Sequence, residues 1–217
     1  MTGGASGTAA HRRRDARRNR ELIVEAARAV FREQGLAAPL DVVARRAGVG
    51  NATLYRHFAR RADLVDAVFR DQLSGTMSAG ERARTADDAW EGLTGYLEVV
   101  FTVLASDRGT NDLMTTSLEG VAALEAVHAH NHRTLDELLR RGRAQGSVRS
   151  DVVVEDVLFA LAALGRAVPA LTAATTPEAW RRPLALLLAG LRPAAPELAL
   201  PEPALTAGQL NATLAGL

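Results

Sequence analysis

Residues 40–58 read LDVVARRAGVGNATLYRHF, and this stretch decides the fold of the N-terminal part. Its apolar positions predict a short helix over about 40–47 and a second short helix over about 51–57. Gly48 stands between them, where a tight turn favours glycine. The spacing therefore predicts a helix-turn-helix unit over about residues 39–58.

The second of these helices is expected to have an inner and an outer side. Val49 is expected to fill the turn, and Leu54 and Phe58, four residues apart, anchor the helix. The outer side then carries Asn51, Ala52, Thr53, Tyr55, Arg56 and His57. Their polar groups can bond base edges and phosphates, and a helix fits the major groove of DNA. The alternatives are a surface aromatic for Tyr55 and a helix-dipole contact for His57.

Charge is divided unevenly along the 217 residues, although the net charge is only +1. Residues 1–61 contain 13 Arg and 5 acidic residues, a net charge of +8. The remainder contains 13 Arg and 20 acidic residues, a net charge of −7. A basic end on an acidic body predicts a head that binds a polyanion.

Composition excludes several classes of function. The chain has no Cys and no Lys, which rules out thiolate chemistry, a Schiff-base lysine and a Walker lysine. Neither a Gly-rich phosphate loop nor a nucleophile elbow is present, and nothing brings Ser117, His132 and Asp136 together as a triad. We therefore expect no enzyme activity and no cofactor. Ala, Leu, Arg and Glu at helical spacing predict an all-α fold of about nine helices.

Four parts are expected along the chain. Residues 1–13 form a disordered basic arm, and residues 14–73 a helix-turn-helix DNA-binding domain. Residues 74–192 form an effector-binding and dimerisation domain, whose boundary stretch 74–87 is rich in Gly, Ser and Thr. Residues 193–217 form an extended Pro-rich tail. Helices are expected at about 14–34, 40–47, 51–57, 61–73, 89–105, 111–118, 121–144, 154–168 and 177–191, the last kinked or starting late because of Pro183.

The head resembles a known family at specific positions, which are Ala44, Ala47-Gly48-Val49, Thr53-Leu54-Tyr55, His57-Phe58, Leu64, and in the first helix Ala26-Ala27, Phe31 and Gly35. This pattern resembles the signature of TetR/AcrR transcriptional regulators over about residues 14–69. The resemblance implies a homodimeric repressor on a palindromic operator in double-stranded DNA. It also implies a larger C-terminal helical domain that binds a small hydrophobic effector, which releases the DNA.

By position, the resemblance also implies individual contacts with DNA. Residues 51–53 would approach bases, while Tyr55 and His57 would contact phosphates, Tyr55 also a base or a thymine methyl. Arg45 and Arg61 would flank the helix and hold the DNA backbone. Pro39 and Gly50 stand where the family often has Ser or Thr, so a capping hydroxyl is lost at each helix.

The segment 11–20 carries six Arg in nine residues from Arg12. We hypothesise that this arm, including Arg13 and Arg14, follows phosphates or enters a narrow minor groove. The alternative is a solvated basic tail.

The helix expected over 121–144 suggests an effector pocket. His128 and Asn131 fall on its apolar face, where buried polar groups need partners. We hypothesise that both line a pocket together with Trp90, Leu97, Phe101 and Met114. The alternative is a polar pair satisfied within the protein. A metal held by His128 and His132 lacks a third ligand, so no metal is predicted.

The last two expected helices are predicted to dimerise as a four-helix bundle with the partner, through Leu161, Leu164, Gly165, Leu187 and Leu191. The alternative is that these residues belong to a monomeric core. The longest apolar run, 157–165, is shorter than the ~18 residues of a membrane span, so a cytoplasmic protein without membrane contact is expected. Two other functions remain open: a DNA binder without sequence preference, and a ligand-independent regulator whose C-terminal domain only dimerises.

Overall fold

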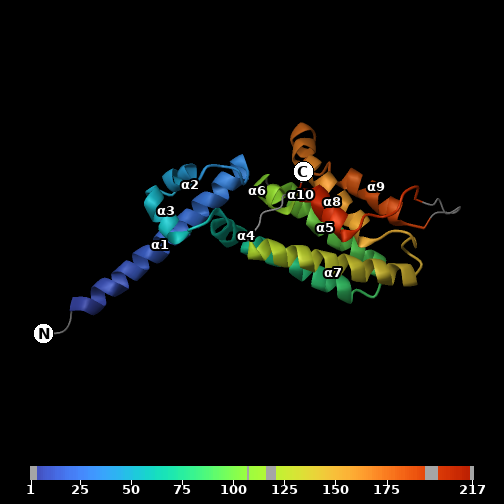
Figure 1. The fold of residues 1–217 in the computed structure, drawn as a ribbon, viewed down its shortest axis with the longest axis horizontal. Helices are drawn as coiled ribbons and strands as arrows, with labels where there is room; N and C mark the ends of the chain where they lie inside the picture. Colours follow the sequence, from blue (N-terminus) through green and yellow to red (C-terminus); the bar gives the residue numbers. More distant parts are fainter. Residues whose placement is uncertain (1–3, 107, 116–120, 194–199, 216–217) are drawn as a thin grey trace.

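The computed structural model describes residues 4–106, 108–115, 121–193 and 200–215 (Figure 1). The described part is helical and contains no strand. Its helices are α1 (Gly4–Gln34), α2 (Leu40–Arg46), α3 (Asn51–His57), α4 (Arg61–Thr85), α5 (Ala89–Ser106), α6 (Arg108–Thr115), α7 (Ala122–Ala144), α8 (Val154–Ala174), α9 (Arg181–Leu191) and α10 (Ala207–Ala215). The predicted all-α fold is therefore correct.

A small head forms at one end of the molecule from α1, α2, α3 and the start of α4 (Figure 1). Its core contains Ile23, Phe31, Leu54 and Leu64, none of which is exposed. The rings of Phe31 and Phe69 stack with centroids 6.3 Å apart, which fixes α1 against α4. α2 and α3 lie within a residue of their predicted bounds because their apolar spacing is purely local.

The helix expected to end at about residue 73 is longer, because α4 continues unbroken from the head into the body as far as Thr85. Thr76, Ala79, Gly80 and Ala83 are buried along one side of this helix. Small residues on that side let α7 approach closely, and α4 and α7 run side by side in the body (Figure 1). One rigid element therefore joins the head to the rest of the chain.

α5 is the central helix of the body, as its apolar residues on both sides predict. Leu93, Leu97 and Phe101 are fully buried, and Tyr96 nearly so. α5 packs against α4 and α7 and also against α8 and α9. Phe101 stacks on Trp180, which lies just before α9, with centroids 6.0 Å apart.

The two ends of the chain differ from expectation. α1 begins at Gly4, whereas residues 1–13 were expected to be disordered; residues 1–3 lie outside the described residues. Its N-terminal turns project beyond the head (Figure 1). At the other end, the Pro-rich tail contains α10, which packs against α8 through the buried Leu210. The prediction of an extended tail rested on its proline content alone, and it missed the helix that follows the last proline.

α8 and α9 also shift from their expected bounds. α8 reaches Ala174 with Pro169 inside it, and α9 starts late, so that Pro183 falls in its first turn, where no backbone N–H is needed. By length and composition α8 could span a membrane, although the apolar run 157–165 alone was too short to indicate this. Only 22% of the apolar stretch of α8 is buried within the chain. An apolar helix this exposed needs a further covering surface.

Candidate nucleic-acid interface and cavity

The turn between α2 and α3 is built as the sequence predicts. Gly48 takes a left-handed conformation with φ of +68°, and the Val49 amide donates to the Ala44 carbonyl at 3.0 Å. Val49 packs partly buried against the head core, and Leu54 and Phe58 are buried beneath α3. Neither Pro39 nor Gly50 provides a side-chain cap, as expected.

This packing leaves one side of α3 facing out. Asn51, Ala52, Tyr55 and Arg56 are exposed, with 53% of Tyr55 accessible, and Thr53 is half-buried. With half of its side chain accessible to solvent, Tyr55 does not contribute to the core of the head. The outward residues are therefore those predicted to approach DNA.

Three residues that flank the outward side of α3 have surroundings within the head that bear on their predicted contacts with DNA. Arg45 is exposed and pairs with Asp41 at 3.2 Å. Arg61 donates to the carbonyls of Leu36 and Ala38, which ties part of its guanidinium to the loop before α2, and its contact with the DNA backbone stays a prediction. His57 buries its Nε2 without a partner among the described residues. Burial, with Arg56 and Arg20 nearby, lowers the pKa of His57, which favours its neutral imidazole.

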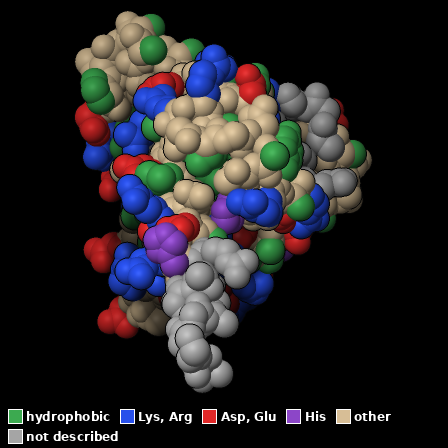
Figure 2. Space-filling model, turned by 90° about the vertical axis from the view of Figure 1, so that its left-hand side faces the viewer, with side chains coloured by type: hydrophobic (Ala, Val, Ile, Leu, Met, Phe, Trp, Pro, Cys, Tyr) green, Lys and Arg blue, Asp and Glu red, His purple; other side chains and the backbone are tan. Residues whose placement is uncertain are grey.

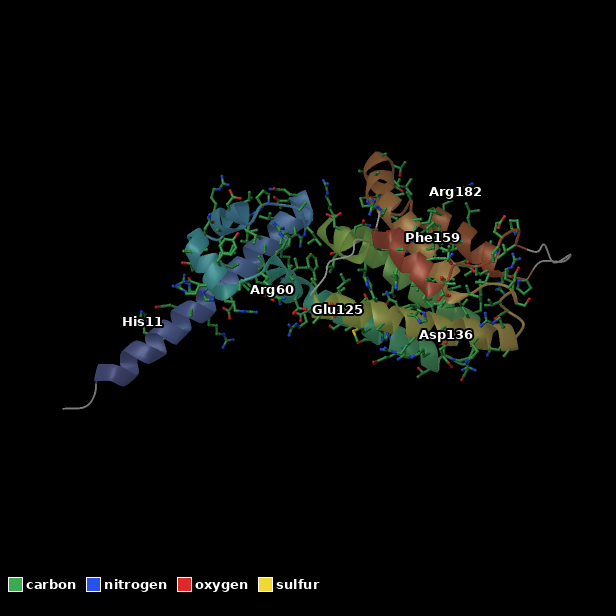
Figure 3. All side chains as sticks on the ribbon, viewed as in Figure 1. His11, Arg60, Glu125, Asp136, Phe159 and Arg182 are labelled. Carbon is green, nitrogen blue, oxygen red and sulfur yellow. The ribbon has the colours of Figure 1, made fainter. Side chains whose placement is uncertain are left out.

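α1 extends the basic surface past α3. The Arg20 guanidinium lies 5.1 Å from the centre of the Phe58 ring, so this part of α1 adjoins the end of α3. Arg14, Arg17 and Arg18 are exposed on the preceding turns, and His11 lies on the projecting end (Figure 3). Figure 2 looks at this end of the molecule and shows Arg side chains spread over it. The side chain of Arg13 lies outside the described residues.

A cavity of about 210 Å³ opens in the body between α5, α7, α8 and α10. Its lining is mostly apolar, with polar groups from α7, α8 and α10: Val100, Leu104, His128, Asn131, His132, Glu155, Leu158, Leu161, Ala162, Ala207, Leu210, Asn211 and Leu214. His128 and Asn131 thus lie where the sequence placed them, on the wall of a pocket. Burial lowers the pKa of His128, which favours a neutral imidazole.

The other predicted lining residues lie elsewhere. Leu97 and Phe101 are fully buried in the body core, and Trp90 lies under Arg192, whose guanidinium is 4.0 Å from the ring centre. The side chain of Met114 lies outside the described residues. Because α5 is apolar all round, sequence could not tell which side meets the cavity, and Val100 and Leu104 do so instead. The sequence analysis did not place Glu155 or the α10 residues in the pocket, because no pattern in their sequence indicated it.

α7 also carries polar contacts behind the cavity wall. The Tyr96 hydroxyl donates to Asn131 Oδ1 at 2.5 Å, and burial raises the pKa of Tyr96 well above its usual range. One turn on, the Arg84 guanidinium of α4 donates to Thr134 Oγ1 at 2.7 Å, and Thr134 lies 3.3 Å from His130 Nε2. α7 therefore touches the cavity on one side and α4 on the other. The described residues include no cluster of three His, Asp or Glu side chains that could hold a metal.

Three of the predicted dimer residues face inward. Leu161, Gly165 and Leu191 are buried in their own chain, and Asn111 Nδ2 donates to the Gly165 carbonyl at 2.7 Å. Leu164 and Leu187 are half-buried. The exposed apolar residues of α8 and α9 stand about one helical position away: Phe159, Ala163, Ala167, Ala170, Ala185, Leu186, Ala189 and Gly190. Both sides of each helix are apolar, so their sequence could not show which side is buried within the chain, and the dimer interface stays a prediction.

Comparisons with known proteins agree with this geometry. Residues 23–68 match the family model for bacterial regulatory proteins of the tetR family. Residues 88–193 match the C-terminal domain of SbtR-like transcriptional regulators. The chain belongs to the TetR family. It is an all-α regulator with an N-terminal helix-turn-helix domain, and this family consists of transcriptional regulators rather than enzymes.

Individual relatives cover parts of the chain. The HTH-type transcriptional activator FasR of Mycolicibacterium smegmatis is 36% identical over 96 residues, 43% of each protein, so this match spans less than half of that relative. The crystal structure of the TetR regulator SCO0520 from Streptomyces coelicolor is 28% identical, with a TM-score of 0.52 over 81% of this chain and 99% of that one. FadR of Bacillus subtilis in complex with stearoyl-CoA shares the fold at 20% identity, with a TM-score of 0.59 over 79% of this chain and 99% of that chain.

Proposed function

We propose that this TetR family DNA-binding regulator acts as a homodimeric repressor in the cytoplasm. It binds a palindromic operator through α3 and leaves it when a small apolar effector fills the cavity. The observation that carries the proposal is the outward side of α3, where Tyr55 is 53% exposed with no packing role in the head. We favour repression over activation because release of DNA is sufficient to relieve it, with no contact to polymerase required.

Asn51, Ala52 and Thr53 begin α3 and are the residues for base contact, with Tyr55 and Arg56 on the next turn. Arg45 flanks the helix and supplies charge to the DNA backbone. His57 contributes through Nδ1, since its Nε2 is buried. Phosphate contacts set orientation and affinity, while the base contacts of α3 set sequence preference.

The exposed apolar side of α8 and α9 supports a dimer. Leu186 is 66% exposed and Phe159 39%, on helices whose other sides form the body core (Figure 3 shows Phe159). Small residues between them allow close helix approach, as a four-helix bundle with a second copy requires. A dimer also supplies the two heads that a palindromic operator requires. The alternative is that a membrane covers this surface. The oligomeric state in solution distinguishes a dimer interface from a membrane contact.

The route from the cavity to the DNA follows two helices. Asn131 lines the cavity, and the next turn of α7 contacts Arg84 of α4 through Thr134. α4 runs unbroken into the head, so a displacement of α7 changes the position of α3. The cavity favours this ligand-responsive regulator over one whose C-terminal domain only dimerises.

Selection of bound sequences from a random duplex library tests the proposal. A specific regulator enriches an inverted repeat and binds it about 10³-fold or more tighter than random DNA at the same salt concentration. The Tyr55→Ala variant loses operator affinity by about tenfold or more, while Arg140→Gln on α7 does not. Enrichment of no sequence, with equal affinity for all duplexes, would instead identify a DNA binder without sequence preference.

A further inference from the structure

The charge of the cavity lining narrows the class of molecule that fits. Arg is the only side chain in this sequence that carries a permanent positive charge, since Lys is absent, and no Arg is among the described residues that line the cavity. Glu155 is the sole carboxylate among the described lining residues, and desolvation lowers the pKa of His128, which favours its neutral imidazole. An anion placed there would lose water, would meet no Arg among the described lining residues and would face a carboxylate. The cavity therefore disfavours acids and phosphates.

Glu155 lies in the first turn of α8, where a carboxylate is favoured, but it does not cap the helix. The capping contact of that helix belongs to its neighbour, because the Val153 amide donates to Asp156 Oδ2 at 2.9 Å. The Glu155 side chain is nevertheless only 16% exposed. Within the described part of the chain its ion-pair partner is His132 Nε2 at 3.8 Å, which is beyond hydrogen-bond distance. This carboxylate is mostly covered and stands on the cavity wall, where it can accept a hydrogen bond from a donor on a bound ligand.

Size limits the ligand as well. A cavity of ~150 Å³ accommodates benzene, so about 210 Å³ suits one ring with a short substituent. Leu104, Leu158 and Leu214 supply the apolar wall for such a ring. The polar strip is confined to α7, the start of α8 and Asn211, so a polar group at one end of the ligand reaches it.

We propose that the cavity binds a small apolar molecule carrying a protonated amine, and that Glu155 selects for that charge. This rests on the proposed function, in which the cavity is the effector site. The ammonium group donates to the Glu155 carboxylate, and the ring lies among the leucines. Glu155 is then the specificity-determining residue of the site.

Three probes of one size and different charge test the inference on the full-length protein: 2-phenylethylamine, 2-phenylethanol and phenylacetate. Calorimetry is expected to give the tightest binding for the amine, about tenfold or more weaker binding for the alcohol, and none for the acid. A charge-assisted hydrogen bond to a partly buried carboxylate accounts for a factor of that size.

Glu155→Gln is expected to weaken amine binding about tenfold or more and to leave alcohol binding within about twofold. Glu125→Gln is the matched control, because Glu125 also lies in the first turn of a helix but is exposed and outside the cavity. The control keeps wild-type amine affinity. Melting temperatures establish that both variants are folded.

The inference is overturned if phenylacetate binds as well as the amine, if Glu155→Gln leaves amine binding unchanged, or if the amine does not bind at all. Operator binding is measured separately without any probe. If the protein binds its operator and the alcohol, but not the amine, releases it, the proposed function stands and the ligand class is wrong. If no specific operator is found, the proposed function fails regardless of how the probes bind.

Discussion

His130 of α7 packs directly against Gly80 of α4, so closely that a methyl group on Gly80 would overlap its imidazole Nε2. The same methyl group would lie 3.0 Å from Thr134 Oγ1, the hydroxyl that binds Arg84. It is a close contact between α7, which lines the cavity, and α4, which carries the head. The contact depends on the absence of a side chain at position 80.

Gly80→Ala is therefore expected to destabilise the protein by about 1–3 kcal/mol, because overpacking outweighs the gain in helix propensity. Gly75→Ala on the same helix is the control, since an added Cβ there meets nothing within 4 Å. It should be neutral or stabilise by up to about 1 kcal/mol. Urea unfolding of both variants measures the difference, and equal stabilities would show that α7 tolerates displacement from α4.

The burial of His130 makes stability depend on pH. Loss of water, together with Arg84 and Arg133, lowers the pKa of His130 in the folded protein. The unfolded chain then takes up the proton first, below its ordinary pKa of about 6.5. The free energy of unfolding is therefore fully present above that pH and decreases as the pH falls from about 7.5 to about 5.5.

His130→Asn should show a smaller change in unfolding free energy over the same range. Carboxylates with lowered pKa, such as Asp63 and Asp151, titrate at lower pH, so they do not account for a change in unfolding free energy over this pH range. NMR titration of the imidazole protons gives a second measurement, in which the His130 signal has its midpoint below about 6.5. A wild-type pH slope in the variant would contradict the assignment to His130.

What sequence could and could not predict follows from the range of the interactions. α2, α3 and the inner and outer sides of α3 depend on apolar spacing within about 20 residues, and they lie where predicted. The helical continuity of α4 past residue 74 depends on α7 covering Thr76, Ala79 and Gly80, a contact more than 40 residues away in sequence. Local composition there indicated a break, and tertiary packing overrode it.

The cavity shows the same division. His128 and Asn131 could be placed on its wall because polar residues on an apolar helix side are conspicuous. The choice of Val100 and Leu104 over Leu97 and Phe101 needed the packing of α5 between two layers of helices. α8 and α9 are apolar on both sides, so the sequence could not show which side is exposed. Leu161 and Leu191 are buried in the core, and Leu186 is exposed.

The exposed side of α8 and α9 should prove to be the dimer interface. Leu186→Glu places a charge in an apolar contact that a second copy covers, which costs several-fold to many-fold in dimer affinity. Leu200→Glu is the control, because Leu200 is 44% exposed and lies outside both helices. Analytical ultracentrifugation at micromolar concentration should find the first variant monomeric and the control dimeric. A wild-type protein that sediments as a monomer would remove the dimer from the proposal.

The projecting end of α1 should add to DNA affinity through charge alone. Arg14 and Arg18 are exposed one turn apart, and neither is needed for the core. The double change to Gln is expected to weaken binding to all duplexes alike. It should also reduce the slope of log affinity against log salt by about 1 for each phosphate that these arginines neutralise in the wild-type protein. Arg82→Gln and Arg140→Gln in the body provide the charge-matched control. An unchanged slope would mean that this segment is only a solvated basic helix.

α10 should behave as a separately mobile wall of the cavity. Leu210 is its buried residue and lines the cavity, whereas Thr213 on the same helix is exposed. Leu210→Ala removes most of the apolar contact of a nine-residue helix, which is too short to persist in water without packing. Hydrogen exchange should then show loss of protection confined to α10, with the free energy of global unfolding lowered by less than about 1 kcal/mol, because opening is local. Thr213→Ala should leave the protection of α10 at the wild-type level. Global destabilisation of about 2–5 kcal/mol by Leu210→Ala would instead make α10 part of the cooperative core.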